Sequence, residues 1–335
     1  MYIIIPSYEP DHRLITLVAE LQEKLPHAKL IVVNDGSDDS YYPFFQEVGK
    51  SGVTVLEHVT NKGKGAALKT AFTFISKKQE DDIIITVDSD GQHLPTDIVK
   101  VAQEAQDSHD HLVLGSRAFV GKVPFRSRFG NKVTATLFHL VTGQKVSDTQ
   151  TGLRAFSTRQ IPWLLQLDGD RFEYEFNMLL EANKANLELV EVPIATVYLE
   201  DNKSSHFRPV QDSIRIYAPF LKFSSTAILA ALIDALALFM LMALTDHLLF
   251  SVITARVVSA TVQCLLNANL VFKRTSQLFK STMRYFMLAL AMLACNYVLM
   301  KSLITIGIWL VVAKLLTESL LFIVSYRVQR ERVFI

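Results

Sequence analysis

Two aspartates one residue apart, Asp88 and Asp90, are the side chains of this chain best suited to chemistry. They follow the apolar run 83–87 and are followed by Gly91 and Gln92. Two carboxylates at a strand end can approach one hard cation together, and Mg²⁺ or Mn²⁺ takes oxygen ligands that it often shares with phosphates. Open α/β sheets bind ligands beyond the carboxyl ends of their strands. A solvated acidic turn is the alternative, and the neighbouring motifs argue against it.

The elements that must position these carboxylates alternate along the chain up to about residue 222. Short apolar runs separated by stretches of helical periodicity favour a mostly parallel sheet covered by helices on both faces, an α/β fold. Pro95 fits the first turn of a helix after the acidic motif. We predict helices at 11–25 and 63–77 and strands at 2–6, 29–33, 53–57, 82–87 and 112–114.

Two further strand ends carry polar groups that could converge with the aspartates: 6–9 and 34–38. Asp35 can accept a hydrogen bond from a base N–H or a ribose hydroxyl, and Gly36 allows close backbone approach. A turn that caps a helix explains the same composition. The segment 61–65, with two lysines at a helix N-terminus, is a candidate pyrophosphate site, or else a flexible helix start with solvated lysines.

Five motifs in order carry a family resemblance: 5–8, 33–38, 61–65, 87–92 and 115–117. Together they resemble glycosyltransferase family 2, which has the GT-A fold. The sequence is most similar to the branch of dolichol-phosphate mannose synthases and polyprenyl-phosphate glucosyltransferases. The resemblance covers roughly residues 1–220. Its strength lies in the order of the five motifs, because no single motif is specific.

The resemblance implies a role for each motif. The metal and its diphosphate would be held by Asp88 and Asp90, with Gln92 as a further ligand, and the metal would be Mg²⁺ or Mn²⁺. Glu9-Pro10 stands where many relatives have Asn-Glu, which puts the role of Glu9 in question. The residues implied to bind the nucleotide sugar are Pro6, Tyr8, Glu9, Asp35, Gly36, Lys62, Lys64, Asp88 and Ser89.

The acceptor side resembles the family in the segments 126–131 and 148–154. Arginines supply forked donors suited to a phosphate, although a solvated basic loop is the alternative. Asp148 could orient the acceptor or cap the turn that follows it. The residues expected to bind an acceptor phosphate are Arg117, Arg126, Arg128, Gln150 and Thr151. The catalytic residues are expected to be Asp88, Asp90, Arg117 and Asp148.

Two carboxylates, Glu173 and Glu175, open a predicted helix. One of them could be a general base for a hydroxyl acceptor, or both could simply favour the helix N-terminus. Processive polysaccharide synthases of this family carry a Gln-x-x-Arg-Trp motif. Neither Trp163 nor Trp309 stands in that context, which disfavours a processive polymerase.

From Phe223 onward the composition is dominated by apolar residues. Four apolar stretches, 223–245, 249–272, 283–304 and 308–326, each approach the roughly 20 residues needed to span a bilayer. We therefore divide the chain into a catalytic domain at 1–208, an amphipathic juxtamembrane helix at 209–222 and an all-α four-helix transmembrane domain at 223–335. The last resembles the GtrA-like family of four-span proteins associated with polyprenol-linked sugars. Weakly similar ends of spans two and four hint at an internal repeat.

Basic residues lie mostly on one side of the predicted spans, although Lys301 lies near the end of span three. They occupy the loop between spans two and three and follow span four, at Lys273, Arg274, Lys280, Arg284, Arg327, Arg330 and Arg332. The positive-inside rule then predicts a multi-pass protein of the cell membrane, with both termini and the catalytic domain in the cytoplasm. The N-terminal residues 1–6 are a first strand rather than a signal peptide. A formal net charge of +1 gives no argument for a nucleic-acid partner.

Charged residues interrupt the predicted spans at Asp234, Arg256, Lys314 and Glu318. Such residues are costly in lipid and often mark function. They could form a polar path for a lipid-linked sugar headgroup, or they could pair internally and reach the span ends. Asn267, Asn269 and Asn296 could form hydrogen bonds between helices.

These features together predict a membrane-bound, metal-dependent, inverting glycosyltransferase. The expected donor is a nucleoside-diphosphate sugar, a UDP-sugar by preference, and the expected acceptor is polyprenyl phosphate, specifically undecaprenyl phosphate, in cell-envelope glycosylation. A phosphate acceptor is already ionised and needs no strong base. One alternative is a glycan or protein hydroxyl as the acceptor, and another is a lipid-linked-sugar flippase with a non-catalytic soluble half. The sequence leaves the sugar and the oligomeric state open, a homo-oligomer included.

Overall fold

The computed structural model describes residues 1–107, 109–117, 125–195, 208–273 and 278–334, without the side chains of 125–127 and 209. The chain divides into two compact units. The first comprises Met1–His139 and Gln144–Ile216, and the second comprises Leu140–Gly143 and Tyr217–Ile335.

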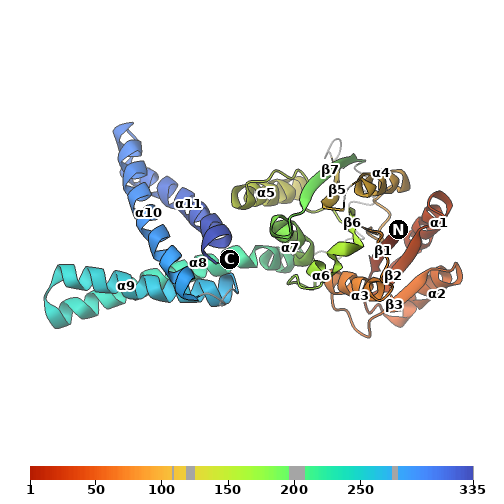
Figure 1. The fold of residues 1–335 in the computed structure, drawn as a ribbon, viewed down its shortest axis with the longest axis horizontal. Helices are drawn as coiled ribbons and strands as arrows, with labels where there is room; N and C mark the ends of the chain where they lie inside the picture. Colours follow the sequence, from red (N-terminus) through yellow and green to blue (C-terminus); the bar gives the residue numbers. More distant parts are fainter. Residues whose placement is uncertain (108, 118–124, 196–207, 274–277, 335) are drawn as a thin grey trace. The chain divides into compact units, whose positions relative to one another are not determined.

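The first unit is built on one seven-stranded sheet with the order β3-β2-β1-β4-β6-β5-β7 (Figure 1). The strands are β1 (Tyr2–Ser7), β2 (Lys29–Asn34), β3 (Thr54–Glu57), β4 (Ile83–Thr86), β5 (His111–Arg117), β6 (Arg154–Ser157) and β7 (Glu188–Ile194). All neighbours pair in parallel except β6, which is antiparallel to both β4 and β5. The predicted mostly parallel α/β fold is confirmed.

Helices cover the sheet and link its strands (Figure 1). They are α1 (His12–Lys24), α2 (Tyr42–Lys50), α3 (Lys64–Ser76), α4 (Pro95–Gln106), α5 (Phe125–Thr142), α6 (Ile161–Leu164) and α7 (Glu173–Ala182). The strands and helices predicted from the sequence are confirmed, and α4 begins at Pro95 as expected. Two strands were missed. β6 starts with a charged residue and β7 carries two glutamates, so neither shows an apolar run.

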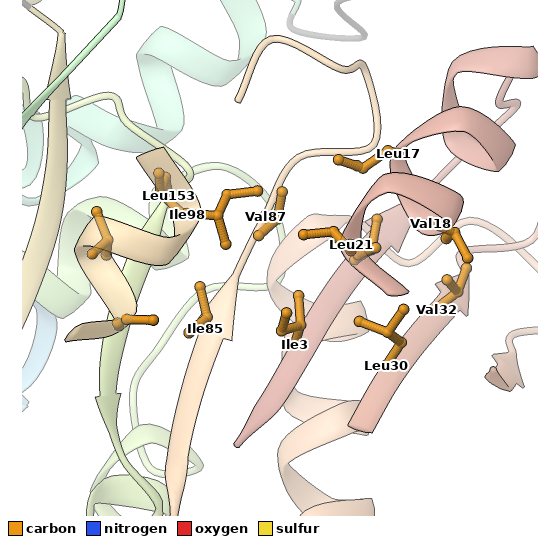
Figure 2. Close-up of a cluster of buried hydrophobic side chains, with 14 of the residues drawn as sticks. Ile3, Leu17, Val18, Leu21, Leu30, Val32, Ile85, Val87, Ile98 and Leu153 are labelled. Carbon is orange, nitrogen blue, oxygen red and sulfur yellow. The ribbon is translucent and has the colours of Figure 1, made fainter. Parts of the chain in front are cut away.

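The hydrophobic core lies between the sheet and its helices, and Figure 2 shows the face covered by α1 and α4. Buried side chains from both helices meet odd-numbered residues of β1 and β4 there. The main members labelled in Figure 2 are Ile3, Leu17, Val18, Leu21, Leu30, Val32, Ile85, Val87, Ile98 and Leu153. On β1, Ile3, Ile4 and Ile5 are all fully buried, which is why this strand reads as a continuous apolar run.

The register of the central strands places their polar ends together. Ser7 pairs with Asn34 between β1 and β2, and Ile4 pairs with Thr86 between β1 and β4. Extending the pairing of β1 with β4 by two residues beyond Ile4 and Thr86 places Asp88 opposite Pro6. The predicted convergence of three strand ends at one edge of the sheet therefore occurs.

The described residues of the second unit are almost entirely helical. It contains most of α8 (Pro209–Thr245), followed by α9 (Leu248–Leu266), α10 (Leu278–Thr305) and α11 (Leu310–Val328); π-helical turns at Asn267–Val271 and Gln329–Val333 follow α9 and α11. Helix α8 passes without a break through residue 222, where a boundary was predicted. Among the described residues, three helical segments are apolar and long enough to span a membrane: Val210–Thr245, Leu248–Val271 and Leu278–Thr305. Helix α11 carries Lys314, Glu318 and Arg327, and a fourth span there remains a prediction.

The two π-helical turns meet inside the second unit. Asn267 is fully buried; its Oδ1 accepts a 2.6 Å hydrogen bond from Thr226 and its Nδ2 donates at 2.9 Å to Gln329 Oε1. The rings of Phe272 and Phe334, one residue beyond each turn, stack with centroids 5.1 Å apart. Equivalent features at the ends of two helix pairs agree with the internal repeat predicted from the sequence.

The charges within the predicted spans pair internally. Arg256 Nη2 lies 3.3 Å from Asp234 Oδ2, and Ser259 donates at 2.9 Å to the other oxygen of this carboxylate. Lys314 Nζ lies 2.5 Å from Glu318 Oε1, which also accepts from Asn296. Internal ion pairing, one of the two predicted alternatives, is therefore present, and a polar path for a headgroup remains a prediction.

Candidate active site

The site forms where the loop after β4 meets the segment before β6. Thr86 Oγ1 donates a 2.8 Å hydrogen bond to the carbonyl of Gly152. Because β6 runs antiparallel to β4, the residues just before β6 lie at the same edge of the sheet as the residues just after β4. A Cβ atom on Gly152 would lie only 2.3 Å from Asp88 Oδ2, so a glycine is required for the carboxylate to occupy this place.

Lys64 bridges two carboxylates at the centre of the site. Its Nζ lies 2.6 Å from Asp88 Oδ1 and 2.9 Å from Glu175 Oε2. The lysine side chain is only 14% exposed, so solvent screens these ion pairs weakly. The sequence predicted Lys64 as a phosphate contact and did not predict its pairing with Asp88 or Glu175.

Two glycines allow Lys64 to reach Glu175. A Cβ on Gly63 would lie 2.4 Å from Arg171 Cγ, and one on Gly65 would lie 2.6 Å from Tyr174 Cβ. The start of α3 therefore packs directly on the start of α7. These glycines serve helix packing, whereas the sequence suggested either a phosphate-binding start of a helix or a flexible start with solvated lysines.

Burial and neighbouring charges shift the pKa values of Asp88, Lys64 and Asp90. Burial tends to raise the pKa of Asp88, but the Lys64 ammonium and the His93 ring lower it by more. The pKa of Asp88 therefore lies below its usual value, and the carboxylate stays ionised. Burial would lower the pKa of Lys64, but Asp88 and Glu175 raise it. Burial and the nearby charge of Asp88 both raise the pKa of Asp90. The carboxylates of Asp88 and Asp90 therefore repel each other, which favours binding of a cation between them.

His93 is a site residue that the sequence reasoning missed. Its Nε2 lies 3.2 Å from Asp88 Oδ2, and the ring is buried. Its position five residues after Asp88 in the same loop is the only sequence signal for this contact. With Lys64 on one oxygen and His93 on the other, both oxygens of Asp88 have protein partners.

Asp90 lies in the tight turn after Asp88. Its Oδ1 accepts a 3.0 Å hydrogen bond from the backbone N–H of Gln92, and Gly91 takes a positive φ of 77°. Within the described ranges, no group of three or more His, Cys, Asp or Glu side chains is arranged to hold a metal. Two carboxylates without a full protein cage fit Mg²⁺ or Mn²⁺ that also binds water and substrate phosphates. Gln92 as a metal ligand remains a prediction.

Asp35 and Gly36 hold the loop that carries Lys64. The Asp35 carboxylate, 3% exposed, accepts from the backbone N–H groups of Lys62 at 3.0 Å and Gly63 at 2.7 Å, and lies 2.7 Å from His58 Nδ1. A Cβ on Gly36 would lie 2.3 Å from the backbone of Thr60. The contacts in this structure are therefore to the loop, and the predicted contact of Asp35 and Gly36 with a nucleoside stays a prediction. The Lys62 side chain is exposed at this loop.

The first two strand ends are joined directly. The backbone N–H of Glu9 donates to Ser37 Oγ at 2.8 Å, and Ser37 N donates to Asn34 Oδ1 at 3.0 Å. A hydrogen bond with Glu9, together with burial, raises the pKa of Tyr8. Tyr8 and Glu9 therefore lie beside the segment that follows β2, next to the predicted nucleoside-binding residues. Pro6 is buried in β1, and Ser89 is half-buried between the two aspartates.

Arg117 and Asp148 form a bidentate ion pair. Arg117 Nε and Nη2 donate to the two oxygens of Asp148 at 2.6 and 3.1 Å. Asp148 is 0% exposed, and its Oδ1 also accepts from the backbone N–H of Gln150 at 3.1 Å. Asp148 thus caps its own turn, one of the two predicted alternatives, and it fixes the guanidinium of Arg117. These contacts define a positioning residue.

The other predicted acceptor residues differ in their surroundings. Arg128 on α5 and Gln150 are exposed, whereas the Arg126 side chain lies outside the described residues. Thr151 is fully buried, and its hydroxyl accepts from Leu153 N at 3.3 Å. This geometry favours a positioning role for Thr151 over the predicted contact with the acceptor.

The two glutamates of α7 have different partners. Glu173 Oε1 accepts from the backbone N–H groups of Asp170 and Arg171 at 3.1 and 3.3 Å, so it caps the helix start as one alternative predicted. Glu175 is buried and pairs with Lys64. Beside it, the buried Arg154 donates to the carbonyl oxygens of Thr151 and Glu175 at 3.1 and 2.5 Å. Burial lowers the pKa of Arg154.

The fold and the site define a GT-A-like catalytic domain, with carboxylates, a buried lysine and a positioned arginine at the carboxyl edge of a mostly parallel sheet. Residues 2–161 match the family model "Glycosyl transferase family 2", and residues 222–334 match "GtrA/DPMS, transmembrane domain". The chain is 34% identical to UDP-N-acetylglucosamine–dolichyl-phosphate N-acetylglucosaminyltransferase of Methanococcus voltae, over 60% of this chain and 86% of the relative. The chain therefore belongs to glycosyltransferase family 2, and it is a glycosyltransferase with a C-terminal membrane domain.

Two further likenesses are more distant. Polyprenol monophosphomannose synthase of Mycolicibacterium smegmatis is 25% identical, over 57% of this chain and 75% of the relative. A mannosyltransferase from Pyrobaculum calidifontis, solved in complex with GDP-Man and Mn²⁺, is 13% identical, with a TM-score of 0.43 over 98% of this chain and 86% of that chain. The two family matches and the two sequence relatives confirm the resemblance predicted from the sequence.

Proposed function

We propose that this enzyme transfers a sugar from a nucleoside-diphosphate donor to polyprenyl phosphate, with inversion and with a divalent metal. The names of two relatives support the acceptor class, since one acts on dolichyl phosphate and the other makes a polyprenol monophosphomannose. The name of the first relative also supports a UDP-sugar as donor. We propose undecaprenyl phosphate as the acceptor and the cytoplasmic face of the cell membrane as the place of reaction, in cell-envelope glycosylation.

The observation that carries the proposal is the buried pair of Arg117 and Asp148. A hydroxyl acceptor requires a carboxylate that can remove its proton. Asp148 is fully buried and engaged with Arg117, Glu173 caps α7, and Glu175 pairs with Lys64. Each carboxylate that could act as this base, Asp148 included, thus already has another partner. An ionised phosphate needs no base, and a fixed guanidinium suits it.

Each group of site residues would have its own role in the transfer reaction. Asp88 and Asp90 would hold Mg²⁺ or Mn²⁺, which would neutralise charge on the departing diphosphate. Lys64 and Lys62 add positive charge on the loop beside that diphosphate. Arg117, held in one orientation by Asp148, positions the acceptor phosphate for direct displacement at the anomeric carbon. The apolar helices of the second unit keep the enzyme at the membrane, where its lipid acceptor lies.

A transfer assay tests this function. The purified full chain in detergent is given Mn²⁺ and one labelled nucleotide sugar at a time, with undecaprenyl phosphate or undecaprenol as acceptor. We expect label in the lipid fraction only with the phosphorylated lipid and a suitable nucleotide sugar. Transfer to the alcohol at a similar rate would favour the hydroxyl-acceptor alternative. Mass spectrometry of lipids from cells with and without the gene identifies the sugar.

A further inference from the structure

Lys64 occupies a position that matters for metal binding. Its ammonium lies 2.6 Å from Asp88 Oδ1, on one of the two carboxylates predicted to bind the metal. The other oxygen of Asp88 faces His93 at 3.2 Å, and Gly152 closes the carboxylate from another side. A divalent ion that binds Asp88 therefore approaches a carboxylate that already has a cation. Two cations on one carboxylate repel each other strongly where little water screens them.

Glu175 gives Lys64 a second place to bind. Its Oε2 already lies 2.9 Å from the Lys64 ammonium. Its other oxygen, Oε1, is buried and has no hydrogen-bond partner among the described residues. Lys64 can therefore release Asp88 and remain paired with Glu175, so the release leaves no buried charge without a partner. Moving an ammonium that keeps its counter-ion costs much less than leaving a buried charge unpaired.

We propose that Lys64 is a resident cation of Asp88, which the divalent metal must displace, so that the metal loads together with the nucleoside diphosphate and not alone. The diphosphate brings negative charge that offsets the added metal, and it supplies acceptor oxygens for the released ammonium. Glu175 is the positioning residue that keeps Lys64 within the site during the exchange. This inference rests on the proposed metal site at Asp88 and Asp90.

The test measures binding of Mn²⁺ alone, so it does not depend on activity. The full chain in detergent is titrated with Mn²⁺, with and without UDP, and free Mn²⁺ is followed by electron paramagnetic resonance. The variant is the double substitution Lys64→Met with Glu175→Gln. It removes the ammonium that pairs with Asp88, and it replaces the Glu175 carboxylate so that no buried glutamate is left unpaired. Thermal unfolding checks that it folds. Lys69→Met is the matched control, since Lys69 lies on the same helix and pairs at 3.1 Å with Asp170.

In the wild-type chain and in Lys69→Met we expect weak binding of Mn²⁺ alone, strengthened when UDP is present. In the double variant we expect Mn²⁺ alone to bind about tenfold tighter or more, because a repelling charge is gone. The strengthening by UDP should shrink accordingly. Equal or weaker affinity for Mn²⁺ alone in the double variant, with normal folding, would overturn the role of Lys64 while leaving the metal site intact. If no variant binds Mn²⁺ with or without UDP, the metal assignment itself fails, and the proposed exchange fails with it.

Discussion

The carboxylate of Asp88 lies directly against Gly152, 64 residues further along the chain: a Cβ on Gly152 would lie 2.3 Å from Oδ2 and 2.5 Å from Oδ1. The backbone carbonyl of the same glycine accepts from Thr86, at the end of β4. The predicted metal-binding loop and the predicted acceptor segment are thus one packed structure, and the position of Asp88 depends on the missing side chain of Gly152.

The first prediction concerns this contact. Gly152→Ala should force Asp88 out of place, lower kcat/KM about a hundredfold or more, and destabilise the fold by about 1–3 kcal/mol, as overpacking does. Gly49→Ala in α2 is the control, because among the described residues its Cβ would meet only Val55 Cγ2 on β3, at 3.8 Å. The control should keep activity and gain up to about 1 kcal/mol of stability, since alanine favours a helix. Steady-state kinetics and thermal unfolding measure both effects, and normal activity in Gly152→Ala would contradict the assigned geometry.

The second prediction concerns the metal. Asp90→Ala should abolish transfer and leave the melting temperature close to that of the wild type, because Asp90 lies in a turn at the strand end and not in the hydrophobic core. Removal of metal with EDTA should have the same effect, and Mn²⁺ or Mg²⁺ should restore the wild type only. Asp107→Ala, an exposed residue after α4, is the control. Near-normal turnover in Asp90→Ala would exclude this residue as an essential metal ligand.

The third prediction concerns the acceptor. Arg117→Gln should raise the KM for polyprenyl phosphate more than the KM for the nucleotide sugar, and lower kcat/KM roughly ten- to a hundredfold, because one charge-assisted contact is worth about 1.5–3 kcal/mol. Arg117→Lys should rescue only in part, since lysine lacks the planar fork. Asp148→Asn should resemble Arg117→Gln, because it weakens the bidentate pair that orients the guanidinium.

The glutamates of α7 provide the contrast to the arginine. Glu173→Gln should be mild, because a phosphate acceptor has no proton to remove and an amide oxygen can still cap the helix. The same kinetic assay distinguishes a phosphate acceptor from a hydroxyl acceptor. A loss of several orders of magnitude in Glu173→Gln, with Arg117→Gln near normal, would instead indicate a hydroxyl acceptor.

The fourth prediction concerns topology. In a background with Cys264→Ala and Cys295→Ala, His247→Cys in the turn between α8 and α9 should react with an impermeant maleimide on intact cells. Lys280→Cys, at the start of α10, should react only after lysis, because the basic loop is predicted to be cytoplasmic. The opposite pattern would place the catalytic domain outside the cell.

The fifth prediction concerns the membrane domain. Asn267→Ala removes the hydrogen bonds to Thr226 and Gln329 and should destabilise the domain by about 1–2 kcal/mol, near the upper end for such contacts in membrane proteins. Asn269→Ala in the same π-helical turn should have little effect, since among the described residues Asn269 donates only to the carbonyl of Leu265, one turn earlier. Thermal unfolding in detergent compares the two. Equal losses of stability in the two variants would show that the hydrogen bonds of Asn267 to Thr226 and Gln329 make no specific contribution.

Several features could be predicted from the sequence because they are local. The strands β1, β2 and β4 are apolar runs whose residues are buried on both faces, and polar motifs mark their ends. Asp88 and Asp90 were placed correctly at the edge of the sheet, since the carboxyl ends of parallel strands meet there. The membrane-spanning character of α8, α9 and α10 was also readable, because a helix that crosses lipid needs about 20 apolar residues in succession.

The contacts that build the site depended on the tertiary structure. β6 begins with the buried Arg154, and its antiparallel pairing brings Gly152 to Asp88. Lys64 meets Glu175 only because Gly63 and Gly65 let α3 pack on α7. Asp35, whose contact with a nucleoside remains a prediction, accepts hydrogen bonds from the distant backbone of Lys62 and Gly63. The physical reason is common to all three cases: residue type and local spacing determine which groups can bind a ligand, whereas the packing of distant segments determines which partners those groups have.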